Sequence, residues 1–435
     1  MSWKDIYKNR VTTAEKAVRA IQSGNRVVLG HCTGEPQVVV EAMVDQADRL
    51  ENVEIVHMVA MGKARYCQPG MEKHFRHNAI FVGGPTRQSV AEGRADYTPC
   101  FFNEVPRLFT NGSLPVDVAL IQVSPPDNHG YCSLGVSVDY TRAITLHGET
   151  VIAEVNEQMP RTYGNSFVHV SHLDYIVETS LPLVELKPPR IGDIEEKIGY
   201  NVGELVEDGS TLQLGIGAIP DAVLLFLKDK KNLGIHTEMF SDGVVELVEN
   251  GVITNSAKTL HPGKAIATFL MGTKKFYDFI NNNPFLEMHT VDYTNDPFII
   301  AQNKKMVSIN SALQVDLTGQ VCADTIGYKQ FSGVGGQVDY VRGASRSEGG
   351  KSIIALPSTA AKGTVSRIVS HLDEGAGVTT SRNDVHFIVT EYGSADLRGK
   401  TLNQRAKALI GIAHPDFREP LEQEFSKRFK VNNLV

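Results

Sequence analysis

The sequence predicts an α/β protein made of two similar open domains with mainly parallel sheets. Short runs of β-branched residues alternate with helical stretches along the chain, and glycine and proline separate them. This alternation is typical of α/β folds. The strand-like runs are nearly continuous in apolar residues, as expected for strands buried on both faces of a parallel sheet. A repeated pattern of elements occurs once in each half.

The expected strands occur in both halves of the chain. In the first half they are Arg26–Leu29, Val53–Val59, Ile80–Val82, Val116–Val123 and Val151–Val155. In the second half they are Thr211–Leu214, Gly234–Glu238, Met306–Ile309, Ser352–Leu356 and Val385–Val389. Two prolines, Pro125 and Pro126, and the turn sequence Asn128–Gly130 predict a hairpin after the fourth of these strands.

The repeat consists of a helix, a glycine turn, a strand, a glycine-containing loop and a helix opened by proline. In the first half these parts are Ala17–Asn25, Arg26–Gly30 and a loop through Pro36. In the second half they are Val202–Ser210, Thr211–Gly215 and a loop through Pro220. The next strands also correspond, and in this alignment Met58 of the first copy stands opposite Glu238 of the second.

A domain boundary is expected within Leu186–Arg190, because the adjacent prolines Pro188 and Pro189 forbid helix and favour an extended linker. The length of 435 residues also exceeds what a single core of ordinary size accommodates. We therefore expect an N-terminal domain over residues 1–187 and a C-terminal domain over residues 188–435.

Composition excludes several classes of function. The net charge of −7 gives no electrostatic footprint for nucleic acid or for an anionic membrane. The N-terminus is polar and charged, unlike a signal peptide, and no apolar run approaches the ~20 residues that cross a bilayer. The five scattered cysteines fit reduced thiols, and no ligand cluster at zinc spacing accompanies His31 and Cys32. We expect a cytoplasmic protein without a metal site.

Two glycine-rich loops are candidate binding elements. The first consists of Gly215, Ile216, Gly217, Ala218, Ile219 and Pro220, and it follows a strand and precedes a helix. Its backbone N–H groups and the helix N-terminus suit an anion. The second loop is Gly333–Asp339, in which Gly335 and Gly336 could bring N–H donors to an oxyanion. The alternatives are a tight turn without a ligand and a flexible hairpin tip.

Glu238 ends an expected strand and precedes a turn signal, Met239–Gly243. Ligands of open parallel sheets collect beyond the carboxyl ends of the strands. Glu238 and the Gly215–Pro220 loop are therefore expected on one rim, as parts of a shared site. The alternative for Glu238 is a solvated charge or an ion-pair partner.

Several long motifs in order resemble the family of acetyl-CoA hydrolases and CoA-transferases. They are Val123–Tyr131 with Ser133–Gly135, Ala153–Pro160, Leu214–Pro220, His236–Gly243, Val315–Val321, Gly333–Asp339 and Val389–Gly393 leading to Asp396–Lys400. The resemblance covers essentially the whole chain and implies two α/β domains with the active site between them. Glu238 matches the family nucleophile, and the two glycine loops match the segments that face the oxyanion and CoA.

By the same resemblance, Leu313 and Lys362 would line the CoA channel. The alternatives are a core leucine and a surface lysine, although a lysine suits a phosphate. His31 and Gln213 are candidates for the pocket of the acid, or else ordinary loop and strand residues. No cofactor is expected, because CoA is itself a substrate and forms the covalent intermediate.

The expected reaction moves CoA between short carboxylic acids through a glutamyl-CoA thioester on Glu238. Expected substrates are 4-hydroxybutyrate with acetyl-CoA or butyryl-CoA, and the expected assembly is a homodimer or larger homo-oligomer. Transfer between butyryl-CoA and acetate and hydrolysis of acetyl-CoA are the nearest alternatives. A nucleotide-dependent oxidoreductase and a non-catalytic acyl-CoA-binding regulator belong to other classes.

Overall fold

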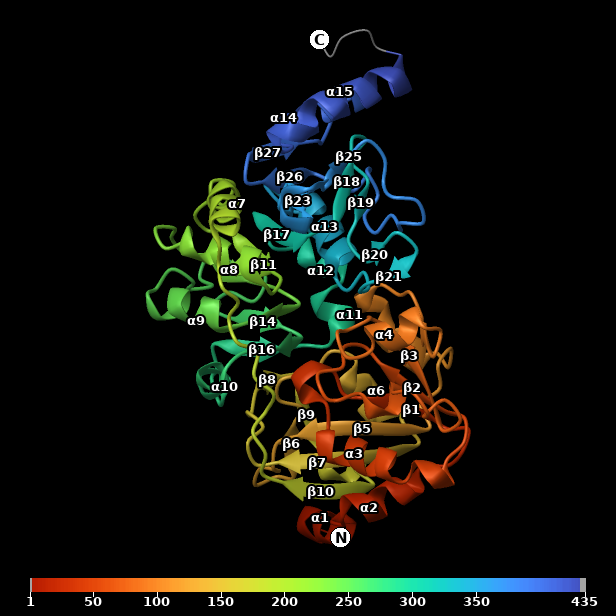
Figure 1. Cartoon of the computed structure of the whole chain (residues 1–435). Helices are drawn as coiled ribbons and strands as arrows, with labels where there is room; N and C mark the ends of the chain where they lie inside the picture. The colour runs from red at the N-terminus through yellow and green to blue at the C-terminus, as the bar shows by residue number, and fades with distance from the viewer. Residues whose placement is uncertain (1, 431–435) are drawn as a thin grey trace. The chain divides into compact units, whose positions relative to one another are not determined.

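The computed structural model describes residues 2–430, which form two compact units. One unit holds the described residues up to Lys187 together with Ile266–Thr294. The other holds Pro188–Ala265 and the described residues from Asn295 onward. Each unit contains one large sheet with helices packed against it (Figure 1), so the predicted α/β class is confirmed.

The sheet of the first unit has seven strands, and every pair of neighbours is parallel. In spatial order they are β10 (Tyr175–Thr179), β7 (Thr150–Asn156), β5 (Val118–Val123), β1 (Arg26–Leu29), β2 (Val53–His57), β3 (Phe75–Ala79) and β4 (Ala95–Tyr97). The helices of this unit are α1 (Trp3–Arg10), α2 (Ala14–Ala17), α3 (Gln37–Asp45), α4 (Arg87–Ala91), α5 (Val105–Thr110), α6 (Thr141–His147), α10 (Lys274–Ile280) and α11 (Val291–Thr294). Strands such as β5 are buried at every residue, which explains their unbroken apolar sequence.

The sheet of the second unit has six strands, of which the last is antiparallel to its neighbour. In spatial order they are β12 (Gly234–Ile235), β11 (Thr211–Leu214), β17 (Met306–Ser311), β22 (Lys351–Ala355), β26 (Phe387–Thr390) and β27 (Gly393–Asp396). The helices of this unit are α7 (Asp193–Gly203), α8 (Ala218–Leu225), α9 (Asp242–Glu249), α12 (Pro297–Ile300), α13 (Gln337–Arg346), α14 (Leu402–Gly411) and α15 (Pro415–Phe429).

The predicted repeat is present in the topology of the two sheets. The order β2-β1-β5-β7-β10 of the first sheet recurs as β12-β11-β17-β22-β26 in the second. The register also agrees, because Val27 stands beside Ile55 in the first sheet and Leu212 beside Ile235 in the second. These pairs are the ones that the sequence alignment equates.

Backbone details of the two copies match as well. Asn52 and Asn232 both adopt left-handed conformations, with φ of 56° and 55°. Gly24 and Gly209 are also left-handed, and each donates its N–H to the carbonyl of the residue before that asparagine, Glu51 at 2.9 Å and Lys231 at 2.8 Å. Because these turns recur at equivalent positions, the two units share one local folding pattern.

A second repeated motif lies at the start of α6 in the first copy and of α13 in the second. Val138-Asp139-Tyr140-Thr141-Arg142 corresponds to Val338-Asp339-Tyr340-Val341-Arg342. Left-handed glycines precede the two motifs at equivalent positions, Gly135 with φ of 60° and Gly335 with φ of 52°. Where the second copy has Gly336, the first has Val136.

Three predictions of local structure differ from the structure. The predicted strand Ile80–Val82 is wrong, because the chain has already left the sheet at Ala79, the end of β3. Gly234–Glu238 is too long, since β12 ends at Ile235. At the predicted hairpin, Asp127 N–H does bond Tyr131 O at 2.9 Å, but the following strand β6 (Tyr131–Ser133) pairs with β9 (Phe167–His169).

The division into units also differs from the predicted domains in one segment. The first change of unit falls between Lys187 and Pro188, whereas Ile266–Thr294 groups with the N-terminal residues. The reason is backbone pairing: Thr268 O accepts the N–H of Val138 at 3.0 Å, and Leu270 N–H donates to Val136 at 2.8 Å. Within the described chain, no helix combines the length and the hydropathy that a membrane span requires.

Candidate active site

Glu238 lies in a tight segment between the end of β12 and β13 (Met239–Phe240). Its side chain is partly exposed, whereas its neighbours His236 and Thr237 are fully buried. The Thr237 hydroxyl accepts the N–H of Leu214 at 3.2 Å and donates to the carbonyl of Met239 at 2.9 Å. Because Leu214 is the last residue of β11, this bond ties the Glu238 segment to the start of the Gly215–Pro220 loop.

The carboxylate of Glu238 is held by a buried amide. Asn295 Nδ2 donates to Oε2 of Glu238 at 2.8 Å, and Asn295, which directly precedes α12 in the chain, is fully buried. Its Oδ1 has no hydrogen-bond partner among the described residues. A buried amide with one unsatisfied atom is costly and is common at functional sites.

Gly336 approaches the same carboxylate more closely than any other residue type would allow. A Cβ atom at Gly336 would lie 2.0 Å from Oε2 of Glu238 and 2.3 Å from Nδ2 of Asn295. Gly336 is also the N-cap of α13, so the carboxylate sits at the positive end of a ten-residue helix. The backbone N–H groups and dipole of such a terminus favour negative charge.

A buried tyrosine completes the surroundings of Glu238. Tyr340, in the first turn of α13, is fully buried, and its ring lies 6.4 Å from that of His236. Burial, together with the nearby charges of Glu238 and Asp339, raises the pKa of Tyr340 well above its ordinary value. The phenol therefore stays neutral and does not compete with Glu238 as an anion.

The Gly215–Pro220 loop connects β11 to α8. Gly217 is the N-cap of α8 and has φ of 116°, a conformation that other residues rarely adopt. Ile216 is exposed at the apex of the loop. The first N–H groups of α8 have no intrahelical acceptors, as at every helix start. This loop is therefore suited to bind an anion.

The remaining predicted residues of the second unit are Leu313, Lys362 and Gln213. Leu313 is partly buried after β17, and its N–H bonds Cys322 O at 2.8 Å. Gln337 Nε2 donates to Ser311 O at 2.7 Å, which links the start of α13 to this segment. Lys362 is exposed at the tip of the hairpin of β23 (Thr359–Ala360) and β24 (Val365–Ser366). Gln213 is buried in β11, where Asn310 donates to its Oε1 at 3.0 Å.

His31 lies in the first unit, at the position that the repeat equates with Ile216. It is fully buried, with Nδ1 3.1 Å from Asp139 Oδ2 and Nε2 3.0 Å from the sulfur of Cys32. Both ring nitrogens thus have protein partners. The role of His31 in an acid pocket stays a prediction, as do the roles of Gln213, Leu313 and Lys362.

The structure brings together Glu238 and Gly336, which the sequence singled out, and adds Asn295 and Tyr340. Asn295 stands in no motif, so no pattern in the sequence pointed to it. Tyr340 belongs to the repeated motif Val338–Arg342, and comparison with Val138–Arg142 would have revealed it.

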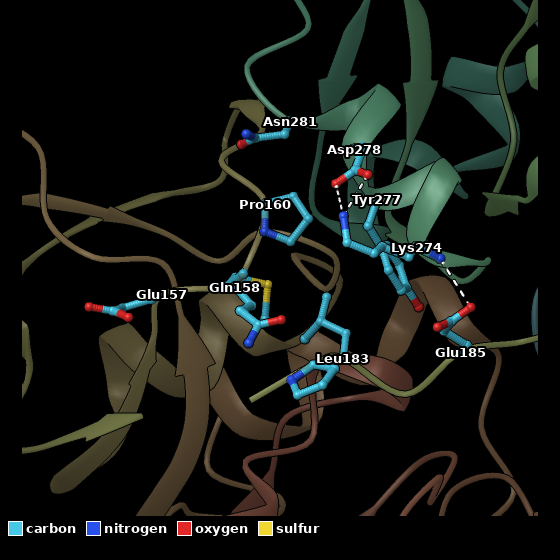
Figure 2. A pocket seen from close by; sticks show the side chains of 11 residues that line it. Glu157, Gln158, Pro160, Leu183, Glu185, Lys274, Tyr277, Asp278 and Asn281 are labelled. Atoms are coloured by element: carbon cyan, nitrogen blue, oxygen red, sulfur yellow. Dashed lines mark hydrogen bonds and ion pairs between the residues drawn. The ribbon is translucent and has the colours of Figure 1, made fainter. Parts of the chain in front are cut away.

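A separate pocket of about 260 Å³ lies in the first unit, beyond the carboxyl ends of β7 and β10 and beside α10 (Figure 2). Most of the charged residues that line it form hydrogen bonds or ion pairs with one another. Lys274 Nζ is 2.7 Å from Asp278, and the backbone N–H of Lys274 donates to Glu185 at 3.1 Å. The Tyr277 hydroxyl donates to Val184 O. This pocket shows no reactive group prepared for catalysis.

Comparison with known proteins agrees with the fold. Residues 1–185 match the model of the acetyl-CoA hydrolase/transferase N-terminal domain, and residues 272–425 match that of the C-terminal domain. The chain belongs to this family.

Several of its relatives are CoA-transferases. A 4-hydroxybutyrate coenzyme A transferase of Clostridium kluyveri is 65% identical over 99% of this chain and 100% of its own length. A butyryl-CoA:acetate CoA-transferase of Anaerostipes caccae is 38% identical over 98% of each chain. The solved structure of a 4-hydroxybutyrate CoA-transferase from Porphyromonas gingivalis has a TM-score of 0.86 and 46% identity, covering 98% of this chain and 100% of that one. The protein is a CoA-transferase.

Proposed function

We propose that this CoA-transferase moves CoA between short carboxylic acids through a covalent thioester on Glu238, with 4-hydroxybutyrate as its acid. The proposal rests on the surroundings of the Glu238 carboxylate. Asn295 orients it, and it lies against the backbone of Gly336 at a helix N-terminus. A carboxylate that is oriented and partly withdrawn from water is suited to attack a thioester.

In the first half reaction, an oxygen of Glu238 attacks the thioester carbonyl of the donor acyl-CoA. The carbon–sulfur bond breaks, and the CoA thiolate leaves with its electron pair. The thiolate then attacks the side-chain carbonyl carbon of the resulting glutamyl anhydride. The donor acid departs as a carboxylate, and CoA remains bound to Glu238 as a thioester.

In the second half reaction, the acceptor carboxylate attacks the glutamyl thioester and displaces the thiolate. The thiolate attacks the acyl carbonyl of the new anhydride, which forms the product acyl-CoA and releases the Glu238 carboxylate. No electrons are gained or lost overall, so the proposed reaction requires no resident cofactor.

Each tetrahedral intermediate carries an oxyanion that needs hydrogen-bond donors. Asn295 Nδ2 and the backbone near Gly336 and Gly217 are the groups suited to this task. Leu313 and Lys362 belong to the proposed CoA-binding surface, and His31 and Gln213 to the proposed acid pocket. A cytoplasmic location and a homo-oligomeric state stay predictions from the sequence.

The choice of 4-hydroxybutyrate rests on the 65% identical relative of that name. Butyrate is the second candidate, because the 38% identical relative is named for butyryl-CoA and acetate. The two acids differ by one hydroxyl group, and an apolar pocket rejects an added hydroxyl by only about 10²-fold, so the two acids require direct measurement. Hydrolysis is the third candidate, since water that reaches the glutamyl thioester would release free CoA.

Initial-rate kinetics test the mechanism. With acetyl-CoA and 4-hydroxybutyrate varied together, a covalent enzyme intermediate predicts parallel double-reciprocal lines. Lines that intersect would mean a ternary complex and would contradict the mechanism. The same assay with butyrate as acceptor ranks the acids by kcat/KM, and CoA release without any acceptor measures hydrolysis.

A further inference from the structure

Lys258 is almost completely buried and contacts the end of the strand that precedes Glu238. Only 5% of the residue is exposed, and its Nζ donates to the carbonyl oxygens of Ile235 at 2.8 Å and Lys264 at 2.7 Å. Ile235 is the last residue of β12, three residues before Glu238. Burying an ammonium group is costly, so a lysine at this position needs a specific explanation.

The position of β12 at the edge of its sheet explains the need for these contacts. In the first sheet the corresponding strand, β2, has a further neighbour, β3, whereas β12 ends the second sheet. The peptide groups of Ile235 are paired with side chains instead. Asn255 Oδ1 accepts the N–H of Ile235 at 2.8 Å, and Lys258 donates to the carbonyl.

Gly234 provides the space through which the lysine stem passes. A Cβ atom at Gly234 would lie 2.4 Å from Cγ and 2.8 Å from Cδ of Lys258. Gly234 does not have a left-handed backbone, so its small size and not its flexibility matters here. The glycine and the lysine therefore form a matched pair at the end of β12.

The first unit places a neutral group at the equivalent carbonyl. Ile55 corresponds to Ile235 by register, and its carbonyl oxygen lies 3.1 Å from Nδ1 of the buried His77. Burial lowers the pKa of His77 to about 4, so this imidazole is uncharged at neutral pH. Three residues after Ile55 stands Met58, which carries no charge. A buried cation accompanies only the copy that has a carboxylate.

We propose that Lys258 is a positioning residue for Glu238. By fixing the Ile235 carbonyl, its ammonium group sets the direction in which the chain leaves β12, and so holds the Glu238 carboxylate against Gly336. The proposal rests on the proposed role of Glu238 as the nucleophile. A displacement of about 1 Å at a reacting group can cost on the order of 10²-fold in rate.

The test compares Lys258→Met, which keeps the stem and removes the charge, with Lys258→Arg and with the control Lys351→Met. Lys351 also donates to a backbone carbonyl of this unit, that of Leu205 at 2.9 Å, but from the first residue of β22. Lys258→Met is expected to lower kcat on the order of 10-fold or more, with KM for both substrates nearly unchanged. Lys258→Arg should recover part of the loss, and Lys351→Met should retain the wild-type kcat.

Thermal unfolding and the rate of CoA attachment to Glu238 are measured alongside. A folded Lys258→Met variant with wild-type kcat and attachment rate would overturn the proposal and leave Lys258 as a structural lysine only. If Lys258→Met does not fold, Gly234→Ala is the second test of the proposal. It displaces the lysine stem and keeps the amine, and an unchanged kcat in this variant would also overturn the proposal. If wild-type enzyme attaches no CoA to Glu238, the proposed function itself fails, which is a separate result.

Discussion

Gly336 and Glu238 lie so close together that the space between them admits no further atom. The contact explains why a glycine stands at the start of α13, where its backbone conformation, with φ of −95°, is available to any residue. The requirement is therefore one of space next to the carboxylate.

Gly336→Ala tests this contact at the residue scale. The added Cβ would overlap Oε2 of Glu238 and displace it from Asn295. We expect kcat to fall on the order of 10²-fold, with little change in the unfolding temperature. Gly411→Ala is the control, because a Cβ at Gly411 meets nothing within 4 Å. Wild-type turnover in Gly336→Ala would mean that the carboxylate does not act from this position.

Asn295→Ala removes the amide that orients Glu238. Losing one well-placed donor at a reacting centre typically costs 10²–10³-fold in kcat, and we expect a loss of about this size. Asn295→Asp should lower kcat further, because it puts a second carboxylate beside that of Glu238. Asn201→Ala, which removes an amide donor to the carbonyl of Thr390 elsewhere in the unit, serves as the control. Equal steady-state rates for Asn295→Ala and wild type would contradict the role of Asn295.

Some of these residues could be predicted from the sequence and others could not. Glu238 and Gly336 stand in motifs, so their positions could be predicted. Asn295 becomes visible only when the chain folds, because it lies 57 residues from its partner along the sequence. Long-range pairs of this kind leave no periodic pattern from which a single sequence could reveal them.

At the scale of elements, α3 shows how a buried charge is linked to a helix. Glu154 of β7 is buried, and its Oε2 accepts the N–H groups of Val38 and Val39 in the first turn of α3 at 2.9 and 3.4 Å. Burial raises the pKa of Glu154 from 4.5 to about 7, although these hydrogen bonds oppose the shift. Helix α3 thus begins against a carboxyl group that titrates near neutral pH.

This titration predicts a pH-dependent stability. Because the folded protein binds the Glu154 proton more tightly than the unfolded chain, the associated stabilisation is present below about pH 4.5 and is lost as the pH rises to about 7. In chemical denaturation, Glu154→Gln should therefore gain stability relative to wild type across this window, by at most about 3 kcal/mol. Glu149→Gln, at an exposed position next to the same strand, should follow the wild-type curve. A constant difference between Glu154→Gln and wild type from pH 4.5 to 7.5 would contradict the linkage.

Element boundaries were less predictable than element types. The run Gly234–Glu238 continues the apolar pattern of a strand, but only Gly234 and Ile235 pair with β11. The side chains of Asn255 and Lys258 bond the N–H and the carbonyl of Ile235 on the open edge of the strand. The burial of His236 and Thr237 continues beyond the pairing, so a run of buried residues does not mark where the strand ends.

At the scale of the whole molecule, two copies of one pattern carry different groups at equivalent positions. Met58 and Val136 of the first copy stand where the second has Glu238 and Gly336. The first copy has no carboxylate at position 58, so the repeat gives no such reason for a glycine at position 136. The repeat could be predicted from the sequence, and the topology of the two sheets confirms it. The grouping of Ile266–Thr294 with the first unit could not, because only its backbone pairing reveals it.

The most direct test of the account is the site of the covalent bond to CoA. Enzyme mixed with acetyl-CoA and no acceptor should carry CoA on the tryptic peptide Asn232–Lys258, attached to Glu238 and released by hydroxylamine as a thioester. The same peptide contains Asp242, Glu246 and Glu249 as internal controls. Glu238→Ala should abolish both the adduct and transfer. An adduct on one of the other acids, or transfer that persists in Glu238→Ala, would contradict the assignment of Glu238 as the nucleophile.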